Sequence, residues 1–236
     1  MNVIAPSAAV TSPPRGAVQV PWPALLGPIA AADAHALDHL AQARMVGDAH
    51  RIFARGEAAR CIVALVDGHA ACGWWQGDRG LSAERVLHAP AWLALAGPWV
   101  DGQYGCDALA QADVVLAELP LEPLRALLAR HPVLALRFTD ALAREVGRLE
   151  GRLHELMHKD AGARLAAWIC AQFAGRPQPV VLRLSERKRD IASQLGMTPE
   201  TLSRLMRNLS DRGLIEVSGY TLRVLDAQAL RGMAGA

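Results

Sequence analysis

The sequence lacks several features that would identify a membrane or exported protein. No apolar run free of charge approaches the ~18 residues that a membrane-spanning helix requires. The N-terminus has no basic segment followed by an apolar stretch, which is the pattern of a secretory signal peptide. The cysteines form no C-x-x-C pair and no regular ladder, and such scattered thiols usually serve as small buried hydrophobes; they are Cys61, Cys72, Cys106 and Cys170. The sequence therefore predicts a protein of the reducing cytoplasm without a membrane partner.

Signatures of several enzyme classes are missing as well. The sequence has no G-x-S-x-G elbow, no P-loop and no G-x-G-x-x-G fingerprint. A metal-dependent enzyme on a cupin-like β-roll would need a His-x-His pair followed by a carboxylate, and that spacing does not occur. We therefore expect no enzymatic activity. A small-molecule-binding or enzymatic β-roll protein stays as an alternative, which a metal assay on the purified protein would separate.

Basic and acidic residues are unevenly distributed, although the whole chain carries a net charge of only +2. From Lys159 onward there are twelve Lys or Arg and seven Asp or Glu, a net charge of +5, and the preceding residues have thirteen and sixteen, a net charge of −3. A basic excess of this kind is typical of a part that binds a polyanion. The hydrophobic content of 52% indicates a globular protein.

Three patterns describe the N-terminal half. Residues 1–23 are rich in Pro, Ala and Ser without an apolar period, which predicts a flexible arm. Ala36, Leu37 and Leu40 recur at helical spacing and predict a short helix over 33–43. Short apolar segments bounded by turn residues follow, typical of strands in an antiparallel sandwich or roll: Arg51–Ala54, Cys61–Val66, Ala70–Trp75, Glu84–His88, Ala91–Leu95 and Val114–Leu119. Within this region Asp67-Gly68 predicts a tight turn between a strand and a return strand.

A long helical pattern separates the predicted roll from the C-terminal part. Leu121–Ala129 reads as a short helix that stops before Pro132. In the helix that follows, over 132–158, apolar residues recur at steps of four, four, three, four and three: Phe138, Leu142, Val146, Leu149, Leu153 and Leu156. This near-heptad spacing predicts the dimer interface of a parallel homodimer. The alternative is a stripe that packs on its own domain.

The C-terminal part, residues 159–236, begins with a predicted helix over Asp160–Phe173 and a short strand over Val180–Leu184. Ser185 is a suitable N-cap for the next helix, and Gly196 can turn the chain sharply after it. Thr198 can cap a second helix whose inward face is apolar, at Leu202, Leu205, Met206 and Leu209. Residues 214–224 then alternate around Ser218-Gly219, which indicates a hairpin. Two short helices, a glycine turn and a hairpin in this order predict a winged helix-turn-helix.

The exposed face of the second helix has side chains that can read base pairs in the major groove. Arg204 can donate two hydrogen bonds to guanine, and Glu200 can accept from a cytosine amine or hold Arg204 in position. Ser203 can contact a base edge or a thymine methyl. Four basic residues are placed for phosphates: Arg187, Lys188, Arg189 and Arg207. The remaining candidates for DNA contact lie at the helix start and the hairpin tip: Thr198, Pro199, Thr201, Ser218 and Gly219.

The runs Lys188–Ala192 and Glu200–Leu205 together resemble the DNA-binding signature of the Crp/Fnr family of bacterial transcriptional regulators. The resemblance implies an α+β fold over the whole chain: an antiparallel jelly-roll sensor domain like those that bind cyclic nucleotides (24–131), a dimerisation helix (132–158) and a winged helix-turn-helix domain (159–236). Glu200 with Ser203 and Arg204 is similar to the Fnr-type branch, which implies TTGAT-like half-sites. Pro199 stands where the Crp-type branch has an additional Arg, so the chain departs from TGTGA-type recognition.

The predicted sensor domain departs from the family's ligand-binding members. Cyclic-nucleotide binders hold the phosphate with an Arg, whereas Val86–Pro123 contains no Arg or Lys, so cyclic AMP is not an expected ligand. Iron–sulfur members carry a cysteine cluster in the N-terminal arm, but the first cysteine here is Cys61, so no such cluster is expected. We therefore predict no cofactor. Haem stays open because histidine is a common axial ligand, the candidates being His35, His39, His50, His69 and His88.

The tryptophans of the predicted roll have two interpretations: they form part of its core, or they line an apolar pocket. They are Trp74, Trp75, Trp92 and Trp99. The resemblance as a whole implies a cytoplasmic homodimer that binds a palindrome in double-stranded DNA and acts with RNA polymerase. A DNA-binding regulator that senses no effector is the alternative.

Overall fold

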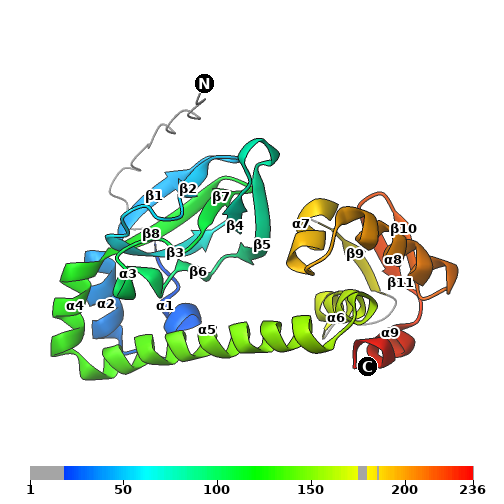
Figure 1. Cartoon of the computed structure of the whole chain (residues 1–236). Helices are drawn as coiled ribbons and strands as arrows, with labels where there is room; N and C mark the ends of the chain where they lie inside the picture. The colour runs from blue at the N-terminus through cyan, green and yellow to red at the C-terminus, as the bar shows by residue number, and fades with distance from the viewer. Residues whose placement is uncertain (1–18, 175–179, 185, 236) are drawn as a thin grey trace. The chain divides into compact units, whose positions relative to one another are not determined.

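The computed structural model describes residues 19–174, 180–184 and 186–235, and the chain divides into an N-terminal unit, Met1–Val146, and a C-terminal unit, Gly147–Ala236 (Figure 1). Two four-stranded antiparallel sheets build the N-terminal unit. The first has the order β1 (Gln42–Val46), β8 (Val114–Pro120), β3 (Cys61–Asp67), β6 (Ala91–Ala94). The second has the order β2 (Arg51–Phe53), β7 (Asp107–Ala110), β4 (His69–Trp75), β5 (Leu81–His88). The expected antiparallel roll is confirmed, and β1 and β7 are strands that the sequence patterns did not indicate.

The turn at Asp67-Gly68 joins two sheets. Gly68 has a φ of 82°, and a Cβ there would lie 2.6 Å from the backbone oxygen of Asp113, so the position requires glycine. The strand and the return strand are both present as predicted. They do not pair with each other, however, because β3 lies in the first sheet and β4 in the second. The predicted strand, turn and return strand are therefore confirmed, and the turn carries the chain from one sheet to the other.

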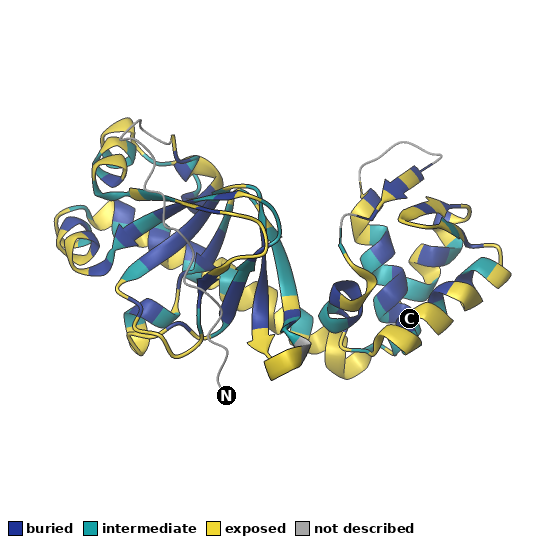
Figure 2. Cartoon of the chain, turned by 90° about the horizontal axis from the view of Figure 1, so that it is seen from above, coloured by how far each residue is buried: buried dark blue, intermediate teal, exposed yellow. Residues whose placement is uncertain are grey.

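Helices cover the outer face of the first sheet, so this unit has two apolar layers. One layer lies between the sheets and includes Val63, Leu65, Cys72 and Leu116. The other lies between the first sheet and four helices, namely α1 (Trp22–Leu26), α2 (Ala31–Leu40), α4 (Leu121–Arg130) and the first half of α5 (Pro132–His158). Figure 2 shows the strands of this unit largely buried. Two short helical segments, η1 (Gly77–Arg79) and α3 (Gly97–Val100), lie in its loops.

The chain is ordered earlier than the expected arm allows. Trp22 is only 1% exposed, and its indole Nε1 donates a 2.7 Å hydrogen bond to Asp38 of α2. Val20 is also buried in the layer beneath the helices. The arm boundary at residue 23 is therefore wrong, because an indole buried in the core fixes the chain around it. Residues 1–18 of the expected arm lie outside the described residues.

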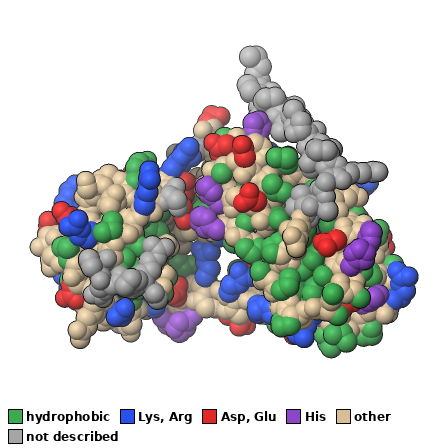
Figure 3. All heavy atoms as spheres, turned by 180° about the vertical axis from the view of Figure 1, so that it is seen from behind, with side chains coloured by type: hydrophobic (Ala, Val, Ile, Leu, Met, Phe, Trp, Pro, Cys, Tyr) green, Lys and Arg blue, Asp and Glu red, His purple; other side chains and the backbone are tan. Residues whose placement is uncertain are grey.

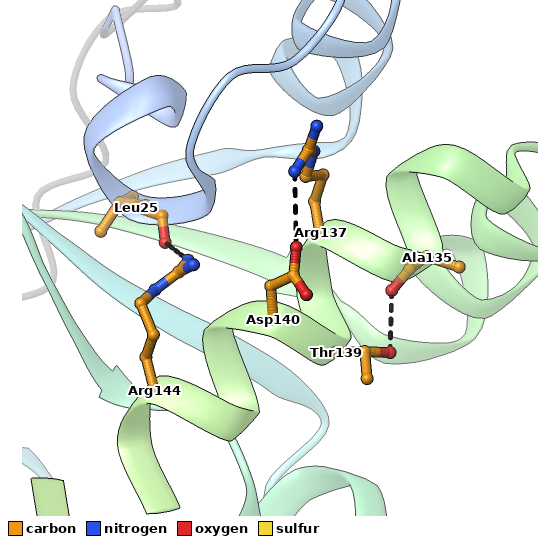
Figure 4. Close-up of polar contacts among 6 residues, drawn as sticks. All are labelled: Leu25, Ala135, Arg137, Thr139, Asp140 and Arg144. Atoms are coloured by element: carbon orange, nitrogen blue, oxygen red, sulfur yellow. Dashed lines mark hydrogen bonds and ion pairs between the residues drawn. The ribbon is translucent and has the colours of Figure 1, made fainter. Parts of the chain in front are cut away.

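Side chains along the first half of α5 fasten it to the N-terminal unit. Phe138 lies 5.9 Å from Trp92, measured between ring centroids, in the layer beneath the helices. Arg144 Nη2 donates to the carbonyl oxygen of Leu25 over 3.5 Å, as Figure 4 shows. Figure 4 also shows two contacts within the helix, Arg137 with Asp140 and the Thr139 hydroxyl with the carbonyl of Ala135. This half of the helix is part of the fold of the N-terminal unit.

The C-terminal unit packs helices on a small sheet. Its elements after α5 are α6 (Ala161–Phe173), β9 (Val180–Arg183), α7 (Lys188–Gln194), α8 (Pro199–Asp211), β10 (Ile215–Ser218), β11 (Thr221–Val224) and α9 (Ala227–Ala234). The sheet has the order β10-β11-β9 and is antiparallel. One core joins Ile169, Ile191, Leu202 and Leu222 from four elements. The helix α9 is an addition to the predicted elements. Among the described residues, no helix has the length and apolarity needed to cross a membrane.

Candidate nucleic-acid interface

The helix-turn-helix is formed by α7, α8 and the turn between them. Gly196 adopts a φ of 62°, as its predicted role requires, and Met197 N–H donates over 3.0 Å to the carbonyl of Ala192 at the end of α7. Thr198 is the N-cap of α8, because its hydroxyl accepts a 3.2 Å hydrogen bond from the backbone N–H of Thr201. Pro199 occupies the first helical position, where a missing N–H carries no cost. The turn and the cap are confirmed.

Burial divides α8 into two faces. Leu202, Met206 and Leu209 are buried in the core of the C-terminal unit, and Leu205 is half-buried against it. The predicted base readers lie on the other face and are exposed: Glu200, Ser203 and Arg204. Arg207, predicted to contact phosphate, is exposed as well. All of the other predicted DNA-contacting residues are exposed except Thr201, which is half-buried and bonded to Thr198. The structure therefore leaves this face of α8 available to a partner.

Glu200 is held at the start of α8 by local hydrogen bonds. Its own backbone N–H and the Thr198 hydroxyl both donate to the carboxylate, and these bonds lower the pKa of Glu200. The carboxylate is thus anionic at neutral pH and lies at the positive end of the helix dipole. This arrangement places a hydrogen-bond acceptor one turn before Arg204 on the same helix.

The N-terminus of α7 carries the basic cluster Arg187, Lys188 and Arg189, all of which are exposed. Arg187 is the N-cap residue and makes no side-chain cap bond. Ser185, the expected cap, lies outside the described residues. Asp190 is buried beneath the cluster, 3.5 Å from Arg189. Burial raises the pKa of Asp190, while the charges of Arg189 and Arg187 lower it. Asp190 therefore forms an ion pair with one member of the basic cluster, and the cluster as a whole still offers positive charge to a phosphate.

The predicted wing is a hairpin of β10 and β11, in which Ser218 pairs with Thr221 and Gly219 has a φ of 59°. Ser218 and Gly219 are exposed at its tip, as expected. The sequence reasoning missed Tyr220, which is exposed beside them, and Arg183 and Arg223, which lie on the outward face of the small sheet. The alternation of β9 and β11 was the signal for these two arginines, because their neighbours Leu182 and Leu222 point into the core.

Two arginine side chains donate hydrogen bonds to backbone carbonyls at the C-terminal end of α7. Arg152 Nη2 donates to the carbonyl of Gln194 over 3.2 Å, and Arg164 Nε donates to the carbonyl of Leu195 over 2.9 Å. The last carbonyls of a helix have no partner within the helix, and cationic donors satisfy them well. Arg152 belongs to the second half of α5 and Arg164 to α6. The helix-turn-helix is thereby joined to both of the helices that precede it.

The expected dimer stripe changes character along α5. Val146, Leu149, Leu153 and Leu156 are about half exposed on the helix surface, as an interface would require before it is covered. Phe138 is 2% exposed and Leu142 is half-buried, both in the layer beneath the helices of the N-terminal unit. Placing Phe138 at the dimer interface is therefore wrong, because its ring is already covered by its own unit.

The tryptophans of the roll fit neither expectation as a group. Trp92 lies in the core, whereas Trp74 and Trp75 are each 41% exposed. The Arg55 guanidinium carbon lies 3.8 Å from the Trp74 ring centroid, and that of Arg51 lies 4.3 Å from Trp75. An open hollow of about 490 Å³ is lined by Arg55, Trp74, Trp75, Asp101, Gln103, Tyr104 and Asp107. Its lining is mixed, so these indoles do not form an apolar pocket.

Histidines offer no assembled metal site in the described part of the chain, which contains no group of three or more His, Cys, Asp or Glu placed to hold a metal. On the face drawn in Figure 3, histidine side chains lie at separate places on the surface. The string His-Glu-Leu-Met-His at 154–158 has the spacing of a zinc-peptidase helix, a signal that the sequence reasoning missed. His154 and His158 are exposed on α5 with ring centroids 4.5 Å apart.

Residues 163–233 match the family of Crp-like helix-turn-helix domains. These residues contain most of α6, the helix-turn-helix, the wing and most of α9. The match therefore covers the elements that carry the candidate interface and excludes the roll and α5.

Relatives extend the similarity beyond this domain. The fumarate and nitrate reduction regulatory protein of Salmonella typhimurium is 30% identical over 138 residues, 57% of this chain and 55% of that protein, so the match spans about half of its length. The transcriptional activator protein FnrA of Stutzerimonas stutzeri is 26% identical over 208 residues, 86% of this chain and 85% of that protein. The solved structure of FixK2 from Bradyrhizobium japonicum has a TM-score of 0.69 and 21% identity, covering 83% of this chain and 98% of that one, which shows a shared fold.

Proposed function

We propose that this chain belongs to the Crp/Fnr family and is a sequence-specific DNA-binding regulator of transcription that acts as a homodimer. The observation that carries this proposal is the exposed face of α8. Glu200, Ser203 and Arg204 lie free of the core near the N-terminus of that helix, which is the end that enters the major groove in helix-turn-helix proteins. The basic excess of the same unit supplies the sequence-independent attraction to phosphate.

The exposed stripe on the second half of α5 is the surface through which we expect two copies to pair. A two-fold dimer presents one recognition helix to each of two successive major grooves, so its operator is a palindrome with half-sites about one helical turn apart. Each half-site resembles TTGAT, with Arg204 on the guanine. At a promoter such a dimer acts together with RNA polymerase.

Selection of bound sequences from random duplex DNA tests the proposal directly. We expect a palindrome in the wild-type selection and loss of the guanine preference in Arg204→Ala, because one bidentate contact contributes about 1–3 kcal/mol per half-site. The Arg204→Ala protein should keep its salt-sensitive non-specific binding. Retention of the guanine preference would contradict the role given to Arg204.

Arg189→Ala is the matched control, because it removes one guanidinium from the same unit without touching the exposed face of α8. We expect this change to weaken binding to all sequences alike and to reduce the dependence of affinity on salt by about one ion per half-site. A change in the selected sequence would instead assign base reading to Arg189. The readout must include protein stability, since Arg189 also neighbours the buried Asp190.

We propose that the roll senses a signal other than cyclic AMP. The segment Val86–Pro123 spans β6, α3, β7 and β8 and has no Arg or Lys to pair with a phosphate. Calorimetry with cyclic AMP should give no binding at micromolar concentration, and operator affinity should be the same with and without it. Micromolar binding would contradict this. A regulator that senses nothing would show one operator affinity under every condition.

A further inference from the structure

Two cysteines from neighbouring strands meet inside the roll. Cys72 of β4 is paired with Ala108 of β7, and Cys106 lies two residues before Ala108 on the same face. A hydrogen bond joins the two thiols. Cys72 is buried between the sheets, whereas Cys106 is partly accessible from solvent. The pair therefore consists of one thiol that a small reagent can reach and one that it cannot.

A guanidinium lies beside both thiols. Arg85 is the cross-strand partner of Cys72 on β5, and its charge acts on both Cys72 and Cys106. The same guanidinium makes a 2.5 Å ion pair with Glu145 of α5, and both of these charged side chains are largely buried. Arg85 thus connects the thiol pair to the last turn of α5 within the N-terminal unit.

The surroundings shift the pKa values of the two thiols in opposite directions, so that Cys106 is the more reactive nucleophile. The hydrogen bond from Cys72 and the charge of Arg85 lower the pKa of Cys106 to about 7, against burial and the nearby carboxylates of Glu84 and Asp107. The hydrogen bond to Cys106 and burial raise the pKa of Cys72 well above its usual value. Near neutral pH about half of Cys106 is thiolate, and the thiolate is the reactive form.

We propose that Cys106 and Cys72 form a dithiol that hydroperoxides oxidise to an intramolecular disulfide, and that this oxidation is transmitted to α5 through Arg85. The thiol chemistry stands independently of DNA binding, whereas its regulatory meaning rests on the proposed function.

The chemistry balances as a two-electron oxidation by hydrogen peroxide. The Cys106 thiolate attacks one peroxide oxygen, the O–O bond breaks, and hydroxide leaves, giving a sulfenic acid. Cys72 then attacks the sulfenic sulfur and gives up its proton, the S–O bond breaks, and the S–S bond forms. The hydroxide released in the first step takes up the proton that Cys106 lost on ionisation, and the hydroxide released in the second step takes up the proton of Cys72, so the dithiol and one peroxide yield a disulfide and two water molecules. The cysteines lose two electrons and the peroxide gains them.

Formation of the bond requires the chain to move. Diagonal neighbours in a sheet have Cα atoms about 7–8 Å apart, whereas disulfides need about 4.4–6.8 Å. Cys106 lies in the bend just before β7 begins, where no ladder hydrogen bond fixes it. Oxidation also removes the thiolate that attracts Arg85. Both changes act on the guanidinium that holds Glu145, so the oxidised and reduced proteins differ at α5.

Alkylation and oxidation of the full-length protein test the thiol chemistry. At pH 7 Cys106 has about 50 times the thiolate of a thiol with pKa 9, and its lower nucleophilicity removes about a factor of ten, so we expect alkylation at least about fivefold faster than at Cys61 or Cys170. Stoichiometric peroxide should reduce the titratable thiols from four to two, with a loss of two hydrogen atoms in intact mass. Peptide mapping should find the Cys72–Cys106 bond.

Variants assign the two roles. Cys72→Ala should leave a sulfenic acid on Cys106 that dimedone traps, and Cys106→Ser should give neither the adduct nor the disulfide. Cys170→Ser is the matched control and should behave as wild type, because Cys170 lies in the other unit. Equal alkylation rates at all four cysteines, or a peroxide product without the Cys72–Cys106 bond, would overturn the proposal.

Operator affinity measured before and after oxidation tests the regulatory half. We expect at least a fivefold change in wild type that dithiothreitol reverses, and none in Cys106→Ser. An intact disulfide with unchanged affinity would overturn transmission to α5 while leaving the thiol chemistry in place. Absence of operator binding in both redox states would instead contradict the proposed function, since thiol titration does not depend on DNA.

Discussion

The two halves of α5 carry one continuous apolar stripe and use it differently. In the first half, Leu134, Phe138 and Ala141 are buried in the N-terminal unit. In the second half, Leu149 is 54% and Leu153 is 58% exposed. The periodicity is the same in both halves. It therefore does not distinguish an apolar stripe that packs on its own unit from one that is left exposed for a second copy of the chain. What distinguishes them is whether the chain supplies a surface to cover the stripe.

The largest effect is expected from a charged residue on the exposed half of the stripe, because this change should prevent dimer formation. Burying a leucine contributes about 1.5–3 kcal/mol, so Leu149→Glu in both copies should cost a dimer about 3–6 kcal/mol. We expect a monomer in sedimentation at concentrations where wild type is a dimer. Leu136→Glu is the control, because Leu136 is also exposed on α5 but lies off the stripe. A dimeric Leu149→Glu protein would mean that two copies pair elsewhere.

The corresponding change in the buried half should affect folding. Phe138→Ala should destabilise the N-terminal unit by about 3–5 kcal/mol, because it leaves a cavity beside Trp92. Denaturant unfolding would measure the loss, and the protein that stays folded should still sediment as a dimer. Val133→Ala, at an exposed site on the same half, should change stability by less than about 0.5 kcal/mol. If the Phe138→Ala dimer dissociated while its free energy of unfolding stayed unchanged, Phe138 would have to be assigned to the dimer interface.

A smaller effect on stability is expected from loss of a hydrogen bond between α5 and the C-terminal end of α7. Arg152→Met removes the donor to the Gln194 carbonyl and should cost about 1 kcal/mol in the C-terminal unit. Hydrogen exchange would measure this loss of local stability as faster exchange of backbone amides at the C-terminal end of α7. Arg137→Met in the first half provides the comparison, because Arg137 pairs with Asp140 one turn along the same helix. Equal effects from the two changes would show that the fastening contributes nothing.

The smallest predicted effect concerns two glycines that occur in the second half alone. Gly147 and Gly151 lie on the face of α5 opposite the stripe, and a Cβ at either would meet no atom within 4 Å. Each change to alanine should stabilise the helix by up to about 1 kcal/mol without weakening the dimer. Thermal unfolding and sedimentation would measure the two effects. A weaker dimer would place the partner helix over the glycines and not over Leu149.

Sequence reasoning performed best where a residue acts on its immediate neighbours. The Thr198 cap, the Gly196 turn and the two faces of α8 depend on contacts within a few residues, and all three are as predicted. The partner of β3 was not predictable from alternation, because a strand pattern states which residues point inward and not which strand lies beside them. Phe138 was misassigned for the same reason, since its cover comes from Trp92, far away in the chain.

The wing and the roll differ in the same way. The two strands of the wing are joined by a turn at Gly219 and pair with each other, so local alternation was enough. In the roll, Trp74 and Trp75 look like core residues by composition, but arginines from β2 and the loop after it cover their rings at the surface. A cation over an indole replaces part of the cover that a core would give. Composition does not reveal such pairs.

The fastening of α7 by Arg152 and Arg164 has a consequence for how operators could diverge. The proposed recognition helix α8 follows α7 through a four-residue turn, so its position is tied to the second half of α5. In a dimer paired along that half, the angle and register at which the two copies of α5 cross set the spacing between the recognition helices. Substitutions on α5 would then alter the preferred distance between half-sites while leaving the bases read within each one unchanged. Under the proposed function, the spacing of half-sites and the sequence read within them would therefore be separately heritable.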